Sequence, residues 1–550
     1  MGGMLMEMLL FTAIRQHAQH SPERIALQDA QHSLNYAQLW QRIQLRAAEL
    51  QAHHVRRLAI ALDNGIEWAL TDLSALYAGI TVIPVPHFFS ASQQEWLLRT
   101  SQTDSLLTSA SSNWLSAGIL TSAIDSEDSD TASSASVGIS APLSLLQRHL
   151  PQDHAPHHQS DGFSTKAELP SQTDAKEFTA KITFTSGTTG QPKGVCLSNQ
   201  HLMRTTQALA DAVSVLDIQR HLTVLPLTTL LENITGLYVP LLLGATSLLP
   251  SLAEIGFQGS SRLEPQQFLR CLQTFRPHSM VLVPELLRLL LALAPAAADS
   301  LSELRFIAVG GGRVAASLLQ QAQQLNLPVY QGYGLSECGS VVSLNTPQAN
   351  CLGSAGRPLP HCRVRLADDG EILVSGAVMQ GYLLAEQTRT DSASATDTAN
   401  TVDNAPTHAQ ELEIATGDLG YLDDHGFLHI TGRKKNVQIN AYGRNFSPEW
   451  IESEAQICPA IRALVLYGDA LPSNVALIDV MPGQEHALAA QLSALNQGLP
   501  DYAQISHWIV AEPPLSANPD WFTRNGRPRR DVIFQHYQDQ IVRLATGDAQ

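Results

Sequence analysis

The sequence predicts an α/β fold, and the arrangement of apolar segments along the chain carries that prediction. Residues 58–62 form a continuous apolar run, which is typical of a parallel strand buried on both faces. Residues 66–79 follow as an expected amphipathic helix, and residues 80–85 read as a second strand. Strand, helix and strand in this order form a βαβ unit, and the order recurs from residue 100 onward. With 550 residues, the chain is long enough for two or more domains.

The residues before this unit are expected to be largely helical. Apolar side chains recur at helical spacing from Leu10 to His17 and again from Tyr36 to Leu50. Between these groups, residues 25–27 and the turn residues before Leu34 predict a short hairpin.

Later segments continue the alternation. Residues 199–214 predict a helix, residues 222–227 a strand, residues 230–244 an apolar helix and residues 304–309 another strand. The last of these strands runs into Gly310, Gly311 and Gly312, which allow a flat ring to lie against bare backbone.

Two stretches, 121–177 and 385–411, are rich in small and polar residues and predict loose insertions. The first carries His154, His157 and His158, but no Cys or carboxylate is spaced to complete a metal site there.

Composition narrows the class of protein. The chain is 44% hydrophobic and 15% charged, as in ordinary soluble globular proteins, and its net charge of −17 argues against a nucleic-acid partner. Six cysteines without a C-x-x-C pair favour a reducing compartment and argue against a zinc or disulfide framework. The N-terminus lacks the basic region of a signal peptide, and the apolar runs are short or interrupted. We therefore expect a cytoplasmic protein without a transmembrane segment.

One glycine-rich stretch, from Ile182 to Val195, combines hydroxyl donors, flexible backbone and one positive charge after a short strand. Its candidate ligand-binding residues are Thr185, Ser186, Gly187, Thr188, Thr189, Gly190 and Lys193. Several donors, glycines and an ammonium in so short a loop suit a polyphosphate, although the spacing is not that of the common nucleotide P-loop.

This stretch resembles the phosphate loop of the adenylate-forming superfamily, and the chain is most similar to the long-chain fatty acyl-CoA synthetases of the AMP-dependent synthetase and ligase family. Further motifs match in order over about residues 8–540: Val329–Glu337, Gly353–Pro358, Ala415–Lys435 and Phe522–Arg530. The resemblance implies a large N-terminal multi-sheet α/β domain (1–433) and a smaller, mobile α+β C-terminal lid (434–550).

The resemblance also implies roles for individual residues around ATP. Tyr333 would stack on adenine, Gly334 would admit the acyl carbonyl, Ser336 would bond a phosphate, and Glu337 would hold Mg²⁺, which prefers carboxylate and phosphate oxygens. The stretch with Gly310–Gly312 would line the adenine and acyl sites.

The ribose and the lid involve a second group of residues. Asp418 would accept hydrogen bonds from both ribose hydroxyls, and Arg433 would contact ribose and phosphate through its fork of donors. Lys435 would lie at the hinge, and Lys434 and Arg444 would add positive charge for an anionic acceptor.

The chain departs from the family pattern at three positions. Arg527 stands where the family has a lysine that bridges the acyl carboxylate and the α-phosphate; arginine keeps the charge but is planar and bulkier. Thr229 replaces a frequent histidine before Glu232, and Asn436 replaces a frequent acidic residue after Lys435.

The implied reaction joins a carboxylic, by resemblance fatty, acid to AMP and then passes the acyl group to a thiol. Lys193, Glu337 and Arg527 would be the catalytic residues of the first step. The thiol acceptor is either CoA or the phosphopantetheine of an acyl carrier protein. A catalytically degenerate nucleotide-binding protein is the alternative of another class, and Arg527 motivates it.

Overall fold

The computed structural model describes most of the chain outside its polar stretches. The described residues are 9–109, 178–185, 192–258, 262–383, 412–441, 444–522 and 527–546, with two short strands at 122–124 and 144–147. The expected insertion at 385–411, and all of that at 121–177 except these two strands, therefore lie outside the described residues.

The predicted βαβ unit forms the centre of one sheet. In the described part of the chain this sheet has eight strands, in the order β21 (Gly381–Leu383), β9 (Lys193–Ser198), β8 (Thr179–Thr185), β4 (Thr81–Pro84), β3 (Arg57–Ala61), β5 (Ser105–Thr108), β7 (Ser144–Gln147) and β6 (Ser122–Ile124). β3 pairs in parallel with both β4 and β5, as the buried apolar runs predict. β6 and β7 extend the edge of this sheet, so the stretch at 121–177 is not structureless throughout.

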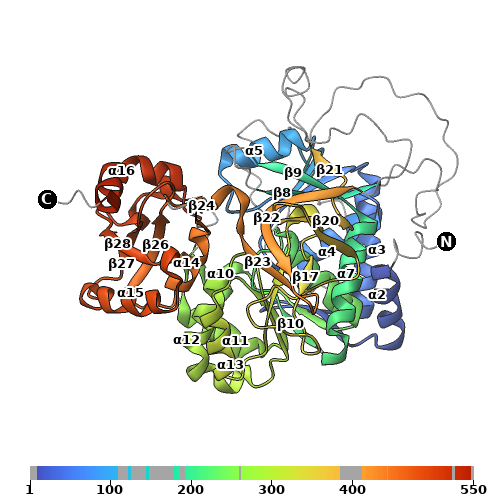
Figure 1. Ribbon diagram of the computed structural model, residues 1–550. Coiled ribbons are helices and arrows are strands. Elements are labelled where there is room, and N and C mark those ends of the chain that lie inside the picture. The colour runs from blue at the N-terminus through green and yellow to red at the C-terminus, as the bar shows by residue number, and fades with distance from the viewer. Residues whose placement is uncertain are drawn as a thin grey trace, which may run out of the picture.

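Helix α4 (Ile66–Tyr77) connects β3 to β4 and corrects one expectation. It is not amphipathic, because every residue from Ile66 to Leu76 except Glu67 is buried. Helix α3 (Tyr36–Ala52) packs on it, and α2 (Leu9–His20) packs on α3, along the side of the large body that faces away from the C-terminal body (Figure 1). A helix covered on both sides buries its whole circumference.

A second sheet carries the other predicted strands. Its nine described strands lie in the order β18 (Arg357–Pro358), β17 (Ser343–Leu344), β16 (Val329–Tyr333), β15 (Phe306–Val309), β14 (Ser279–Leu282), β10 (Arg220–Leu222), β11 (Thr246–Leu248), β1 (Ile25–Gln28) and β2 (Ser33–Asn35). β1 and β2 form the expected antiparallel hairpin. β10 ends at Leu222, five residues before the predicted end of the strand.

The helices of the large domain follow the predicted alternation. They include α5 (Ala91–Thr100), α7 (Asn199–Val213), α10 (Leu252–Ile255), α11 (Pro265–Phe275), α12 (Pro284–Leu301) and α13 (Ala316–Gln324). One apolar cluster joins side chains of both sheets, and another joins the second sheet to α11, α12 and α13. None of the helices among the described residues is long and apolar enough to cross a bilayer.

The apolar segment at 230–244 is not one regular helix. It consists of α8 (Leu230–Glu232), a π-helix (Asn233–Tyr238) and α9 (Val239–Leu243). Asn233 and Tyr238 both hydrogen-bond Lys181 and Asp72. In an α-helix, residues five apart point about 140° away from each other. The wider π turn brings both onto one face, which explains the irregular winding.

A third sheet leads toward the C-terminal region. Its described strands are β19 (Cys362–Leu366), β20 (Glu371–Gly376), β22 (Glu413–Leu422) and β23 (Leu428–Arg433), all antiparallel. β22 and β23 form a long hairpin whose open end carries Asp418 opposite Arg433.

The residues after 434 form a separate body at the end of the large one (Figure 1). Its elements are β24 (Gln438–Ile439), β25 (Asn445–Phe446), α14 (Pro448–Ala455), β26 (Ile461–Tyr467), β27 (Asn474–Val480), α15 (Leu488–Gln497), β28 (Ile505–Val510) and α16 (Arg530–Thr546). Its two apolar cores contain only residues from Phe446 onward. This separation supports the proposed division of the chain near residue 434. The mixed α/β architecture with several sheets confirms the predicted fold class.

Candidate active site

The phosphate-loop strand and the motif at Val329–Glu337 meet through Tyr382. β21 pairs antiparallel with β9, which places Tyr382 beside the strand that begins at Lys193. The Lys193 ammonium lies 5.4 Å from the centre of the Tyr382 ring. The Tyr382 hydroxyl donates a hydrogen bond of 2.9 Å to Oε1 of Glu337. One aromatic side chain thus contacts both the cation expected to hold phosphate and the carboxylate expected to hold Mg²⁺.

The second cluster forms around Asp418. Its Oδ2 accepts a hydrogen bond of 2.8 Å from the Tyr333 hydroxyl, and its Oδ1 lies 2.8 Å from Nε of Arg433. The Asp418 residue is 4% exposed, whereas the Arg433 side chain is 42% exposed. Burial raises the pKa of Asp418, and the neighbouring Arg433 and Tyr333 oppose that rise by favouring the ionised carboxylate.

Arg527 of the C-terminal body acts on the same carboxylate. Its positive charge makes a small contribution that opposes the burial-driven rise in the pKa of Asp418, after the contributions of Arg433 and Tyr333. Arg527 is itself exposed. The role of Arg527, which stands where the family has a lysine, therefore stays a prediction.

Gly334 and Gly311 are required by their backbone surroundings. A Cβ on Gly334 would lie 1.9 Å from the carbonyl oxygen of Ser340, so no other residue fits there. Gly311 has φ of +75°, a conformation that favours glycine, and it lies exposed after β15. A Cβ on the adjacent Gly310 would lie 3.1 Å from the carbonyl oxygen of Gly332, and Gly312 is exposed.

The remaining predicted residues are placed as follows. Thr185 ends β8 opposite Lys193, Ser336 begins the 3₁₀ turn that carries Glu337, and Lys435 lies exposed in a 3₁₀ turn. Five of the predicted ligand-binding residues of the phosphate loop lie outside the described residues: Ser186, Gly187, Thr188, Thr189 and Gly190.

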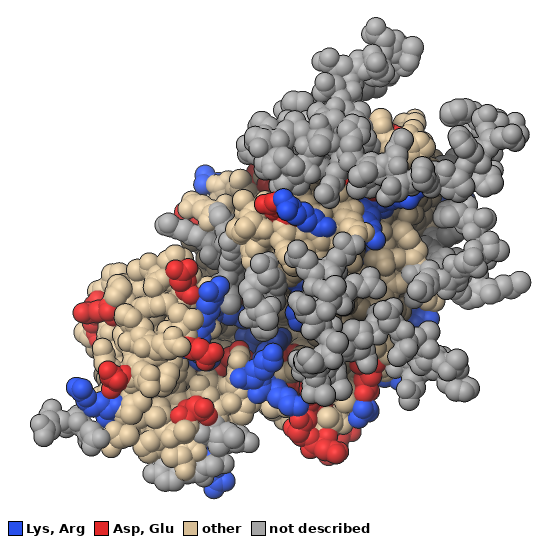
Figure 2. All heavy atoms as spheres, turned by 90° about the horizontal axis from the view of Figure 1, so that it is seen from above, with Lys and Arg blue, Asp and Glu red and all other residues tan. Residues whose placement is uncertain are grey.

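Lys434 corrects the expectation of a basic approach built from Lys434, Lys435 and Arg444. Its ammonium lies 2.5 Å from Asp369 and 2.8 Å from Glu371, so its charge is paired within the large domain. Figure 2 shows Lys and Arg side chains gathered where the two bodies meet, although the whole chain is acidic.

Sequence reasoning gave no role to Tyr382 or to the contacts that hold the two bodies together. The Arg313 guanidinium, which donates to the Thr431 carbonyl within the large domain at 2.9 Å, lies 5.9 Å from the ring of Trp450 in the C-terminal body. Arg288 donates to the Gln456 carbonyl at 2.7 Å. These contacts join residues more than 100 positions apart, and no local sequence pattern predicts them.

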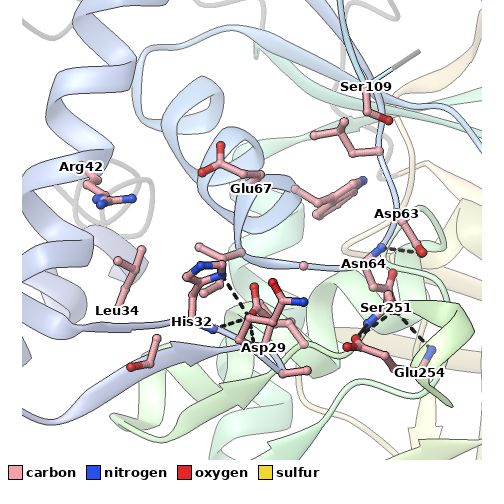
Figure 3. A pocket seen from close by; sticks show the side chains of 18 residues that line it. Asp29, His32, Leu34, Arg42, Asp63, Asn64, Glu67, Ser109, Ser251 and Glu254 are labelled. Carbon is pink, nitrogen blue, oxygen red and sulfur yellow. Dashed lines mark hydrogen bonds and ion pairs between the residues drawn. The ribbon is translucent and has the colours of Figure 1, made fainter. Parts of the chain in front are cut away.

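Two other features do not contribute to the candidate site. Cys338, next to Glu337, is buried, which raises the pKa of its thiol and makes it a poor nucleophile. A cavity of about 370 Å³ lies among β2, α3 and α4, and the residues of Figure 3 line it. Its Asp29 and Asp63 already accept backbone hydrogen bonds, and no predicted site residue lines it.

Comparison with known proteins agrees with the family that the sequence motifs indicate. The family of AMP-binding enzymes matches residues 14–383. The chain is 26% identical to the long-chain-fatty-acid–CoA ligase FadD15 of Mycobacterium bovis over 480 residues, covering 78% of this chain and 73% of that protein. It is 26% identical to 2-succinylbenzoate–CoA ligase of Bacillus subtilis, covering 82% of each chain.

Solved structures agree with the fold. The Bacillus subtilis o-succinylbenzoate-CoA synthetase, solved with its acyl-adenylate intermediate, has a TM-score of 0.67 at 23% identity and covers 95% of this chain and 97% of that one. The same enzyme solved with ATP and magnesium has a TM-score of 0.66 at 23% identity, covering 94% of this chain and 98% of that one. Because the family model matches residues 14–383, about two thirds of the sequence, the chain belongs to the AMP-binding enzyme family.

Proposed function

We propose that this protein is an acid–thiol ligase that uses MgATP to convert a carboxylic acid into an acyl-adenylate and then into a CoA thioester, releasing pyrophosphate and AMP. The observation that carries the proposal is that residues from separate motifs form two polar clusters in the large domain. Lys193, Tyr382 and Glu337 form one cluster, and Tyr333, Asp418 and Arg433 form the other. The two relatives described above are both named as CoA ligases, which supports CoA as the acceptor in this proposal.

In the first step, the acid attacks the α-phosphate and pyrophosphate leaves. The Lys193 ammonium is proposed to hold the departing pyrophosphate, and Arg527 is proposed to align the acid carboxylate with the α-phosphate. Asp418 and Arg433 would hold the ribose through a carboxylate and a guanidinium that already contact each other at 2.8 Å.

Glu337 is the residue proposed to hold Mg²⁺. It offers hard carboxylate oxygens, is half-buried, and is fixed on one side by the Tyr382 hydroxyl at 2.9 Å, which fits a magnesium ligand. When bound, the ion supplies charge neutralisation at the phosphoryl oxygens.

In the second step, a thiol attacks the acyl-adenylate. We propose that the C-terminal body turns about Lys435, moves Arg527 away and opens the site to the thiol. The contacts of Arg288 and Arg313 with the C-terminal body would then have to break.

The acid is proposed to be a fatty acid because the helical segment after the Leu-Pro-Leu sequence is apolar and buried, with Leu230, Ile234 and Leu237 at most 4% exposed. The two relatives differ here, since one is named for long-chain fatty acids and the other for 2-succinylbenzoate. An aromatic dicarboxylate is therefore the competing substrate class.

The experiment offers the purified chain ATP, Mg²⁺ and a panel of fatty acids and 2-succinylbenzoate, with either CoA or a phosphopantetheinylated carrier protein. Mass spectrometry of the products identifies both the acid and the acceptor. We expect acyl-CoA from at least one fatty acid. Acylated carrier protein without acyl-CoA would move the acceptor to the carrier, and nucleotide binding without any thioester or adenylate would reject the enzymatic proposal.

A further inference from the structure

Three side chains of different metal-ligand types converge at the closed end of the β22–β23 hairpin. One ligand atom each from Cys351, Asp423 and His429 lie within 4.8 Å of one another, and all three residues are half-buried. We propose that these residues form a binding site for a transition-metal ion of the zinc class. The site is separate from the proposed Mg²⁺ position at Glu337.

The spacing of the ligand atoms is close to that of a tetrahedral zinc site. Nε2 of His429 lies 3.1 Å from Oδ2 of Asp423. Zinc–ligand bonds of about 2.0–2.3 Å separate tetrahedral nitrogen, oxygen and sulfur ligands by about 3.4–3.6 Å. The His–Asp pair is already near this spacing, and the Cys351 sulfur, within 4.8 Å of both, has to approach by at most about 1.2 Å.

Surrounding contacts hold the ligands before any metal binds. Oδ1 of Asp423 accepts hydrogen bonds of 2.9 Å from the backbone of His425 and of Phe427, which leaves Oδ2 directed at His429. The His429 ring stacks on Tyr421 with centroids 4.7 Å apart and planes 6° apart. Such outer contacts orient metal ligands and reduce the conformational freedom lost on binding.

Cys351 is fixed from the other side of the cluster. Its backbone N–H donates a hydrogen bond of 2.9 Å to Oδ1 of Asn345, whose amide donates to the Gln331 and Ser354 carbonyls. The following backbone pairs with β23, because Ala355 donates to the Leu428 carbonyl at 2.7 Å and Leu428 donates to the Gly356 carbonyl at 2.9 Å. The loop and the hairpin therefore lie side by side without the metal.

The donor set favours one class of ion. A thiolate, an imidazole and a carboxylate suit Zn²⁺ and its substitute Co²⁺, whereas Mg²⁺ and Ca²⁺ prefer oxygen ligands. Three protein ligands leave a fourth position for water. Bound metal would clamp the loop at Cys351 to the turn at Asp423, and the same hairpin carries Asp418 and Arg433 at its other end.

The first experiment titrates metal-free full-length protein with Co²⁺ and records its absorption spectrum. We expect one equivalent to produce a sulfur-to-cobalt charge-transfer band and the visible bands of tetrahedral cobalt, and Zn²⁺ to abolish both. Cys351→Ser should lose the charge-transfer band, and Asp423→Asn and His429→Asn should each weaken binding at least tenfold. Cys196→Ser is the matched control, because Cys196 is also a half-buried free cysteine but lies outside the cluster.

Thermal unfolding and crystallography test the proposal further, and the crystallographic measurement does so even if a variant fails to fold. Zn²⁺ should raise the Tm of the wild type and of Cys196→Ser but not that of Cys351→Ser, while all three should melt alike in EDTA. If Cys351→Ser fails to fold, anomalous scattering from a zinc-soaked wild-type crystal should place zinc among the three side chains. A charge-transfer band that survives in Cys351→Ser, zinc located elsewhere, or no cobalt binding by the wild type would overturn the proposal.

Discussion

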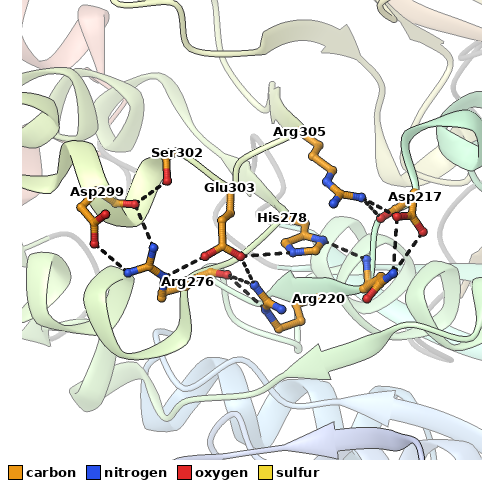
Figure 4. A network of polar contacts seen from close by, with 9 residues as sticks. Asp217, Arg220, Arg276, His278, Asp299, Ser302, Glu303 and Arg305 are labelled. Atoms are coloured by element: carbon orange, nitrogen blue, oxygen red, sulfur yellow. Dashed lines mark hydrogen bonds and ion pairs between the residues drawn. The ribbon is translucent and has the colours of Figure 1, made fainter.

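Two networks of charged side chains in the large domain differ in their contact with water. Lys181 and Asp72 are both 0% exposed, with Nζ 2.6 Å from Oδ1, and Asn233 and Tyr238 complete their hydrogen bonds. Glu303 binds Arg220 and Arg276 at 2.6 and 2.8 Å, but these side chains are 33–38% exposed (Figure 4).

The two arrangements differ in how much they affect the stability of the fold. Burial lowers the pKa of Lys181, and the charge and hydrogen bond of the adjacent Asp72 oppose that fall. In the exposed network, hydrogen bonds from Arg276 and Arg220 lower the pKa of Glu303 to about 2, but water screens the pairs. A buried pair is costly to break, whereas an exposed one contributes little to stability.

The Asp418 cluster is intermediate in exposure between these two networks. The difference in exposure between its carboxylate and its guanidinium suits the binding of a ligand. The carboxylate is buried, but its partner Arg433 remains 42% exposed and open on one side. Such a pair is oriented by the fold and can still share its donors and acceptors with a ligand. The following predictions test this ranking of the three networks.

The largest effect is expected for Lys181→Met, which leaves the Asp72 carboxylate buried without its cation. The free energy of unfolding should fall by about 3–5 kcal/mol, measured by urea denaturation. The double variant Lys181→Met/Asp72→Asn should recover much of the loss, because it removes the unpaired charge and keeps an amide for Tyr238. A single variant within 1 kcal/mol of the wild type would mean that burial does not govern this network.

The next effect concerns Asp418→Asn, which removes the charge from the proposed ribose site. We expect kcat/KM for ATP to fall roughly 100-fold, because hydrogen bonds to charged groups contribute about 1.5–3 kcal/mol each. The melting temperature serves as the control for folding. Unchanged kinetics would exclude Asp418 from nucleotide binding.

The same carboxylate predicts a pH dependence. Burial raises the pKa of Asp418 above its usual value of 3.8, and the ionised form is the one that accepts ribose hydroxyls. Activity should therefore be full above this raised pKa and should be lost as the pH falls through it. Kinetics at constant ionic strength measure the acidic limb, and Asp418→Asn should no longer show it at the same pH.

A smaller effect is expected for Tyr382→Phe. The substitution removes the hydroxyl that donates to Glu337 and keeps the ring beside Lys193. Loss of one such bond costs about 1 kcal/mol, roughly fivefold in the Mg²⁺ concentration that gives half-maximal activity. A magnesium titration of initial rates checks this, and an unaltered midpoint would separate Tyr382 from the metal.

The smallest effect is expected for Glu303→Gln in the exposed network. At physiological salt, its melting temperature should match that of the wild type within experimental error, because screened surface pairs contribute little. A large decrease would show that this network is stronger than its exposure implies.

The sequence predicted the parts of the molecule that depend on local pattern. The apolar runs around residues 58–62 and 80–85 led correctly to parallel strands, since burial on both faces leaves a continuous signature. The motifs led to Lys193 and Glu337, which both contact Tyr382, and to Asp418, which contacts Tyr333 and Arg433.

Contacts between distant residues were not predictable in this way. Tyr382 meets Glu337 only because β21 pairs with β9, almost two hundred residues earlier in the chain. The π-helix at Asn233–Tyr238 depends on Lys181 from β8 and Asp72 from α4, which no helical periodicity reveals. Cys351 and His429 likewise come together through backbone hydrogen bonds of Ala355 and Gly356 with Leu428, which cysteine spacing does not reveal.

Carboxylate-dependent exchange of pyrophosphate into ATP, measured without any thiol, tests the proposed activation of an acid most directly. With an acid accepted by the wild type, Arg527→Lys should retain exchange and Arg527→Ala should lose it at least 100-fold, about 2.7 kcal/mol of transition-state stabilisation. Undiminished exchange by Arg527→Ala would remove Arg527 from the chemistry. No exchange by the wild type with any acid of a broad library would contradict the proposal that this protein activates a carboxylic acid.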